Sequence, residues 1–102
     1  MKRGETGSTA KVAKSAQAEC CVDAFEAASE TVQEVYRARK KFPGNQHLLA
    51  ALMEEVGELA KEMLEHGNSR HARTEAMQVA CVAIRIMTEG DSDYTPDEGG
   101  AA

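Results

Sequence analysis

The stretch from residue 76 to residue 87 constrains the fold more than any other part of this chain. Drawn as a helix, it is apolar on almost every side, and only Gln78 and Arg85 interrupt it. A helix of that kind has to be buried on most sides. The foldable part of a 102-residue chain is too short to cover it alone, because small domains bury a thin core. We therefore expect a helical protomer that forms a homo-oligomer and completes a four-helix-type bundle with its partner.

Between two polar tails the chain predicts three helices and no strand, which is an all-α protomer. The helices are expected over residues 16–41, 46–66 and 69–89. The expected N-caps are Asn45 for the second helix and Asn68 or Ser69 for the third, because such side chains accept hydrogen bonds from free backbone N–H groups. The first helix is expected to pack through one apolar face. That face contains Phe25, Ala28, Val32 and Val35.

The composition divides the chain into one domain and two tails. Residues 1–14 are expected to be a flexible tail, residues 15–90 the helical domain, and residues 91–102 a disordered acidic tail. No apolar run is long enough for a transmembrane helix, and the N-terminus lacks the apolar centre of a secretory signal. The three cysteines include no C-x-x-C pair. Reduced thiols, a cytoplasmic location and no membrane contact are therefore expected.

Acidic residues dominate the charge of the chain and concentrate in the second helix. The formal net charge is −5, which argues against a partner that is a nucleic-acid polymer, because backbone binding needs clustered Lys and Arg. One face of the helix carries glutamates at i, i+3, i+7 and i+10. They are Glu55, Glu58, Glu62 and Glu65, with Glu54 beside Glu58. A divalent cation would relieve their repulsion, and Mg²⁺ and Mn²⁺ prefer carboxylate oxygen. The alternative is a solvated acidic face.

A narrow polar stripe crosses the otherwise apolar third helix. It contains Glu75, Gln78 and Arg85. Burial of Glu75 without a partner would cost several kcal/mol, and a metal shared with Glu55 and Glu58 would satisfy it. The alternative is an ion pair near the mouth of the core. The partners for such a pair are Arg70, Arg73 and Lys61.

Basic residues occupy the first turn of the third helix, where cations oppose the helix macrodipole. They are Arg70, His71 and Arg73. Two interpretations account for them. Either they face phosphate oxygens beside a metal, or they pair with glutamates of the second helix across the short loop.

At this point the residues match a family pattern. Glu54-Glu55-x-x-Glu58, sixteen intervening residues and Glu75-x-x-Gln78 resemble the E-E-x-x-E and E-x-x-D signature of the MazG-like, all-α nucleoside triphosphate pyrophosphohydrolases. The resemblance covers about residues 40–90. It implies an enzyme that hydrolyses a nucleoside triphosphate to its monophosphate and pyrophosphate. It also implies Mg²⁺ as cofactor, with Mn²⁺ as a substitute, and assembly into helical dimers or tetramers.

The resemblance assigns roles residue by residue. The implied metal ligands are Glu55, Glu58, Glu75 and Gln78, and Glu54 would orient the attacking water beside them. Lysines and an arginine are implied to hold the phosphates: Lys40, Lys41, Lys61 and Arg73. Amide and imidazole groups are implied to recognise the base: Asn45, Gln46 and His47. For His47 an ordinary surface histidine is the alternative.

One position departs from the family signature. Gln78 replaces its final aspartate, and an amide offers only a neutral carbonyl oxygen to a metal. The site then has one negative charge fewer. Either metal affinity falls, or Glu62 or Asp91 supplies the missing carboxylate, or the catalytic site has decayed. In the last case the chain is a non-catalytic helical module that binds a nucleotide or a protein.

Overall fold

The computed structural model describes residues 22–96, and this part of the chain is all-helical, as predicted. It consists of α2 (Ala24–Lys41), α3 (Leu48–His66) and α4 (Arg70–Glu89), without a strand. The expected start of the first helix, the N-terminal tail and residues 97–102 lie outside the described residues. None of the described helices is long and apolar enough to span a membrane.

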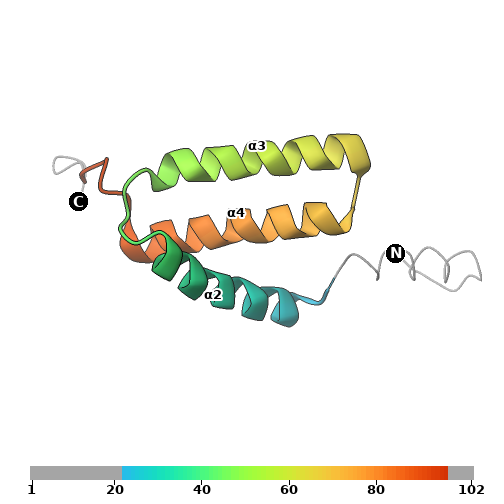
Figure 1. Ribbon diagram of the computed structural model, residues 1–102, viewed down its shortest axis with the longest axis horizontal. Coiled ribbons are helices and arrows are strands. Elements are labelled where there is room, and N and C mark those ends of the chain that lie inside the picture. Colours follow the sequence, from blue (N-terminus) through green and yellow to red (C-terminus); the bar gives the residue numbers. More distant parts are fainter. Residues whose placement is uncertain (1–21, 97–102) are drawn as a thin grey trace, which may run out of the picture.

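The three helices form a single layer with α4 in the middle (Figure 1). Both α3 and α2 pack against α4, and they do not contact each other. α3 and α4 are antiparallel neighbours joined by a short turn, whereas α2 lies beside α4 at the C-terminal ends of both helices. The predicted three-helix protomer is therefore present. Its assembly into a four-helix-type bundle stays a prediction.

Local signals explain how α2 and α4 begin and how α3 ends. The Ser69 hydroxyl caps α4, as predicted, by accepting a hydrogen bond from the Ala72 N–H at 2.9 Å. Asp23 caps α2 in the same way and accepts from the Glu26 N–H at 2.8 Å. Gly67 ends α3 with a positive φ of 68°, a backbone conformation that glycine adopts at little cost.

The predicted start and cap of α3 are wrong. The helix begins at Leu48, and its N-cap position is His47, which has a left-handed backbone and makes no side-chain cap bond. Asn45 instead donates from Nδ2 to the last carbonyl oxygen of α4 at 2.7 Å. The free N–H of Leu49 is bound by the Asp91 carboxylate at 2.7 Å, 42 residues away in the chain. Asp91, which we assigned to a disordered tail, therefore caps α3.

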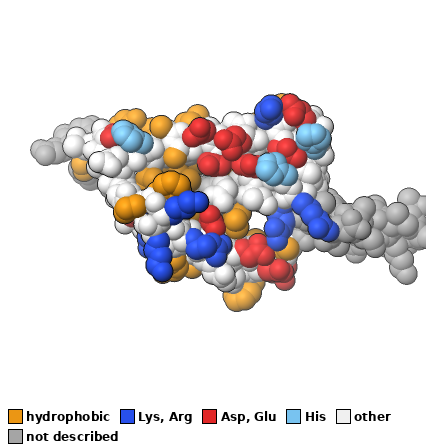
Figure 2. All heavy atoms as spheres, viewed as in Figure 1, with side chains coloured by type: hydrophobic (Ala, Val, Ile, Leu, Met, Phe, Trp, Pro, Cys, Tyr) orange, Lys and Arg blue, Asp and Glu red, His pale blue; other side chains and the backbone are white. Residues whose placement is uncertain are grey.

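The core of this layer is thin. Its buried apolar side chains are Val35, Leu48, Ala72 and Cys81. The predicted packing face of α2 is only partly correct, because the buried residues of α2 are Thr31 and Val35, while Phe25 is 82% exposed. Large apolar side chains reach the surface along both outer helices (Figure 2). A helix that contacts a single neighbour can bury only a narrow stripe, so the remaining apolar faces stay open.

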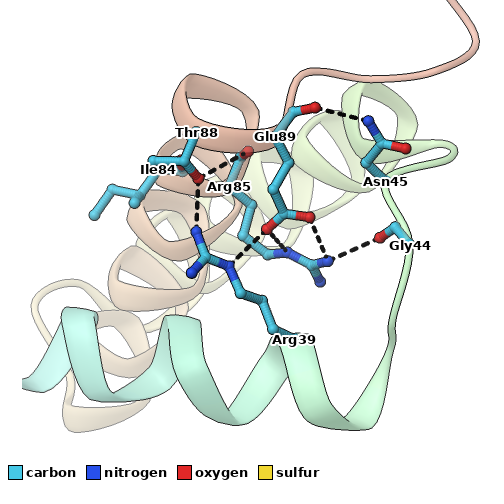
Figure 3. A network of polar contacts seen from close by, with 7 residues as sticks. All are labelled: Arg39, Gly44, Asn45, Ile84, Arg85, Thr88 and Glu89. Atoms are coloured by element: carbon cyan, nitrogen blue, oxygen red, sulfur yellow. Dashed lines mark hydrogen bonds and ion pairs between the residues drawn. The ribbon is translucent and has the colours of Figure 1, made fainter.

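A network of charged groups joins the C-terminal ends of α2 and α4 (Figure 3). Glu89 accepts hydrogen bonds from Arg85 Nε and Nη2, both at 2.9 Å, and from Arg39 Nε at 2.8 Å. Arg85 also donates to the Gly44 carbonyl oxygen at 2.8 Å. The Arg85 side chain is only 5% exposed, and its guanidinium is bonded through Nε and Nη2. The bonds from Arg85, and then the bond from Arg39, lower the pKa of Glu89 to about 2.

We expect Glu89→Gln to lower the free energy of unfolding by about 3 kcal/mol, because it leaves a buried guanidinium without its counter-charge. Urea denaturation at neutral pH measures the loss. The pKa of Glu89 falls from 4.5 to about 2 on folding, so its stabilisation is complete above pH 4.5. The difference between wild type and variant should therefore shrink as the pH falls from 4.5 towards 2.

The matched control is Glu65→Gln. Glu65 is 52% exposed and lies 4.0 Å from Lys61, so its loss should change stability by less than about 0.5 kcal/mol. Equal effects of the two substitutions would contradict a structural role for the network.

Candidate metal centre

Three carboxylates from two helices meet where α3 packs on α4. Glu55 and Glu58 lie three residues apart on α3, and Glu75 faces them from α4. One oxygen of each lies within 4.8 Å of the others. The antiparallel pairing through a short turn brings these residues together, as the metal interpretation of the sequence requires.

Glu75 is the most enclosed of the three carboxylates. Its side chain is 13% exposed, and its Oε1 is buried without a hydrogen-bond partner. Its Oε2 lies 3.1 Å from His71 Nε2, one turn earlier on the same helix. The expected alternative partners, Arg70, Arg73 and Lys61, form no ion pair with it. A buried oxygen without a partner is unfavourable in a folded protein, so Glu75 has an unfilled bonding position.

The electrostatics of the cluster disfavour three negative charges. Burial raises the pKa of Glu55, and the neighbouring charges of Glu58 and Glu75 raise it further. Desolvation and then Glu75 raise the pKa of Glu58, while His71 lowers it. In the folded chain without a cation, these carboxylates therefore lie close together despite their mutual repulsion. A divalent ion would remove that repulsion.

Gln78, the position that departs from the family signature, faces α2. Its Nε2 donates to Glu34 Oε2 at 3.1 Å. The two carboxylates expected to compensate for Gln78 are engaged elsewhere: Glu62 accepts from Ser69 at 2.7 Å, and Asp91 caps α3. Sequence analysis missed Glu34, because nothing in the local pattern of α2 indicates a contact 44 residues away.

Several predicted substrate-binding residues take part in contacts that hold the fold. Asn45 bonds to the end of α4. His47 Nδ1 lies 2.6 Å from Asp93 Oδ2. Arg73 donates to Glu30 of α2 at 3.0 Å, which matches neither of the two expectations for this residue. A role for these groups in substrate recognition stays a prediction.

The other predicted substrate-binding residues and Glu54 are exposed. Those at the end of α2 and in the following loop are Lys40, Lys41 and Gln46. Lys61 is 75% exposed and lies 4.0 Å from Glu65. In Figure 2, Asp and Glu side chains gather over α3, and Lys and Arg side chains gather over the C-terminal part of α2. One face of the layer thus carries an acidic region and a basic region side by side.

The donor set fits a hard divalent cation. Carboxylate oxygens from Glu55, Glu58 and Glu75 are the ligands that Mg²⁺ and Mn²⁺ prefer. The free Oε1 of Glu75 gives such an ion a bonding partner that no protein group satisfies. No family model, no curated protein and no solved structure matches this chain.

We expect Glu55→Gln to raise the thermal midpoint in chelator at pH 7.5, because it removes one of three repelling charges. The pKa of Glu55 is raised on folding from 4.5, so the repulsion is complete above the raised value. The advantage of the variant should therefore shrink as the pH falls towards 4.5. Differential scanning calorimetry across this range provides the measurement.

Added Mg²⁺ should reverse the order, stabilising the wild type and leaving Glu55→Gln almost unchanged. Glu65→Gln is the control and should respond to Mg²⁺ as the wild type does. An equal Mg²⁺ response in all three proteins would exclude Glu55 as a ligand.

Proposed function

We propose that this chain is a metal-dependent hydrolase that converts a nucleoside triphosphate to its monophosphate and pyrophosphate. One observation carries the proposal: carboxylates of Glu55, Glu58 and Glu75 converge from two helices, and Glu75 has a buried oxygen without a hydrogen-bond partner. The resemblance of the sequence around these residues to the MazG-like signature supplies the reaction class.

The position of each residue suggests its role in the proposed reaction. Glu55, Glu58 and Glu75 would hold Mg²⁺ or Mn²⁺. The bound ion would bind phosphate oxygens and lower the pKa of an attacking water. Glu54, exposed beside the cluster, would accept a hydrogen bond from that water and orient it. The imidazole of His71, 3.1 Å from Glu75, would fix the orientation of this carboxylate, as partners of metal ligands commonly do.

The basic end of α2 supports a role in phosphate binding. Lys40 and Lys41 are exposed at that end, and Figure 2 shows Lys and Arg side chains there on the face that also carries the acidic region. A triphosphate bridging the two regions would have its charge met by the metal and by ammonium groups. Gln46, exposed in the next loop, is the amide that remains free to contact the base.

The first assay is pyrophosphate release from ribo- and deoxyribonucleoside triphosphates with Mg²⁺, Mn²⁺ or chelator. We expect metal-dependent release from at least one substrate, with loss of roughly 100-fold or more in Glu58→Gln, because ligand loss removes the ion that polarises the phosphates. The matched control, Glu65→Gln, lies on the same helix and should retain activity.

Two results would contradict the enzyme assignment. Unchanged activity in Glu58→Gln would exclude this cluster as the catalytic site. If no triphosphate in the panel releases pyrophosphate while nucleotide still raises the thermal midpoint, the result would favour the alternative of a non-catalytic binding module.

The same proposal includes assembly into a homo-oligomer with a four-helix-type core. A stripe along α3 supports it, because its apolar side chains recur at helical spacing and remain exposed. The stripe contains Leu49, Met53, Val56 and Leu64, exposed by 40%, 62%, 40% and 88%. Between α2 and α3 runs a groove of about 370 Å³ over the small side chains Ala72, Ala76 and Ala80 of α4. Small residues allow close approach of another helix, so a helix of a partner copy fits this groove.

We expect a Met53→Glu/Leu64→Glu double variant to shift the protein from dimer or tetramer to monomer, because charge on the stripe prevents its burial. Light scattering coupled to gel filtration measures the mass. Lys61→Glu, on a side chain 75% exposed outside the stripe, is the control and should keep the wild-type mass. A wild type that is monomeric at tens of micromolar would contradict assembly.

A further inference from the structure

The outer side of α2 carries large apolar side chains that remain exposed. α2 is an outer helix of the layer (Figure 1), and among the described helices it contacts α4 alone. Phe25, Val32 and Tyr36 are exposed by 82%, 46% and 61%. Spacings of seven and four residues place these three side chains on one face of the helix. Together they form the α2 stripe.

The α2 stripe is separate from the groove between α2 and α3. On α2 that groove is lined by Ala27, Glu30 and Thr31. At 3.6 residues per turn, these positions lie at least about 120° around the helix from Phe25. A helix of a partner copy in the groove would therefore leave the α2 stripe uncovered, and the stripe needs an occupant of its own.

The charges of α2 are divided between its two halves. Most of them form ion pairs within the protomer. Glu26, near the start of the helix, and Lys40, near its end, are exposed, and neither forms an ion pair with another described residue. The acidic residues of the first half are Glu26, Glu30 and Glu34, and the basic residues of the second half are Arg37, Arg39, Lys40 and Lys41.

Glu26 and Lys40 flank the α2 stripe on the same side. They are fourteen positions apart, which is close to four full turns of helix. This separation is about 21 Å along the axis at 1.5 Å per residue, too far for an ion pair within one copy. A second α2 lying antiparallel across the stripe would bring Glu26 of each copy to Lys40 of the other, with Val32 near the centre of the contact.

We propose that the α2 stripe is a self-complementary docking surface for α2 of a second copy, in an antiparallel pair related by a two-fold axis. Charge complementarity identifies this occupant, because an antiparallel copy places each acidic half beside a basic half, whereas a parallel copy would bring like charges together. The surface is distinct from the proposed assembly through α3 and requires no metal or substrate. Lys41 lies on the opposite side of α2 from Phe25, so it stays available to the phosphates of the proposed substrate.

The size of the surface indicates a weak contact. A buried Phe or Tyr contributes roughly 150–250 Å², so the partly exposed rings of two copies supply on the order of 500 Å². Such an area is well below the roughly 1,200 Å² at which stable interfaces begin. Weak contacts persist when two act together. Two dimers joined through α3 can offer two such contacts, so we expect the wild type to be a tetramer. The inference rests on the proposed assembly for this stoichiometry alone.

The test is a charge reversal read out as molecular mass, by light scattering coupled to gel filtration at tens of micromolar. Glu26→Lys and Lys40→Glu each bring like charges together and should each lower the mass from tetramer to dimer. In an equal mixture of the two variants, opposite charges face each other at every contact, so the tetramer should return. Because the two positions are about 21 Å apart within one copy, this rescue requires contact between copies.

The matched control is Lys41→Glu. It makes the same change of charge as Lys40→Glu at the next residue, on the opposite side of α2 from Phe25, and should keep the wild-type mass. All these positions are exposed, so the thermal midpoints should stay close to that of the wild type. An equal loss of mass in Lys41→Glu and Lys40→Glu would contradict the proposed contact.

The outcomes separate this surface from the proposed assembly through α3. Single reversals that leave the mass unchanged, or a mixture that stays dimeric, overturn the α2 surface. If Phe25→Asp then lowers the thermal midpoint, another part of the same chain covers the stripe. A wild-type dimer that Glu26→Lys dissociates, and that Met53→Glu/Leu64→Glu leaves intact, supports the α2 surface and overturns assembly through α3. A monomeric wild type overturns both.

Discussion

The arrangement of the helices depends on the charged network around Glu89. Because α2 makes no contact with α3, its position is set by α4 alone. At the C-terminal ends of these helices, Arg39 and Arg85 share the Glu89 carboxylate, and Arg85 also binds the loop that leads into α3 through the Gly44 carbonyl. The Arg85–Glu89 pair thus connects α2, the loop and α4. Replacing such a network by apolar side chains can preserve stability. The directional bonds of the network, however, also fix the angle between α2 and α4.

The packing of the helices also decides which polar side chains meet. It brings Glu34 of α2 to Gln78 of α4, while the antiparallel pairing of α3 and α4 brings Glu55 and Glu58 to Glu75. The repulsion within the acidic cluster and the unpartnered Oε1 of Glu75 are unfavourable for the isolated fold. Features that cost stability and serve no packing purpose are typical of binding and catalytic sites. These two features are the observations that support the proposed metal site.

Sequence analysis predicted those features that depend on neighbours in the chain. Periodicity indicated an all-α protomer, Ser69 was among the expected caps of α4, and the spacing of the glutamates placed Glu55 and Glu58 on one helical face. It failed where the partner is distant. Asp91, which follows α4 in the chain, accepts the hydrogen bond from the Leu49 N–H. Asn45, the predicted cap of α3, does not make that bond. The buried face of α2 and the contact of Glu34 follow from the angle between helices, which no pattern within α2 encodes.

The most direct test of the central claim is a crystal structure of the protein soaked with Mn²⁺, recorded at a wavelength where manganese scatters anomalously. The account predicts an anomalous peak between Glu55, Glu58 and Glu75, about 2.2 Å from their oxygens as hard cations require, with Glu75 Oε1 among the ligands. A map without a peak there, in which an ordered water or a protein donor binds Glu75 Oε1, would contradict it.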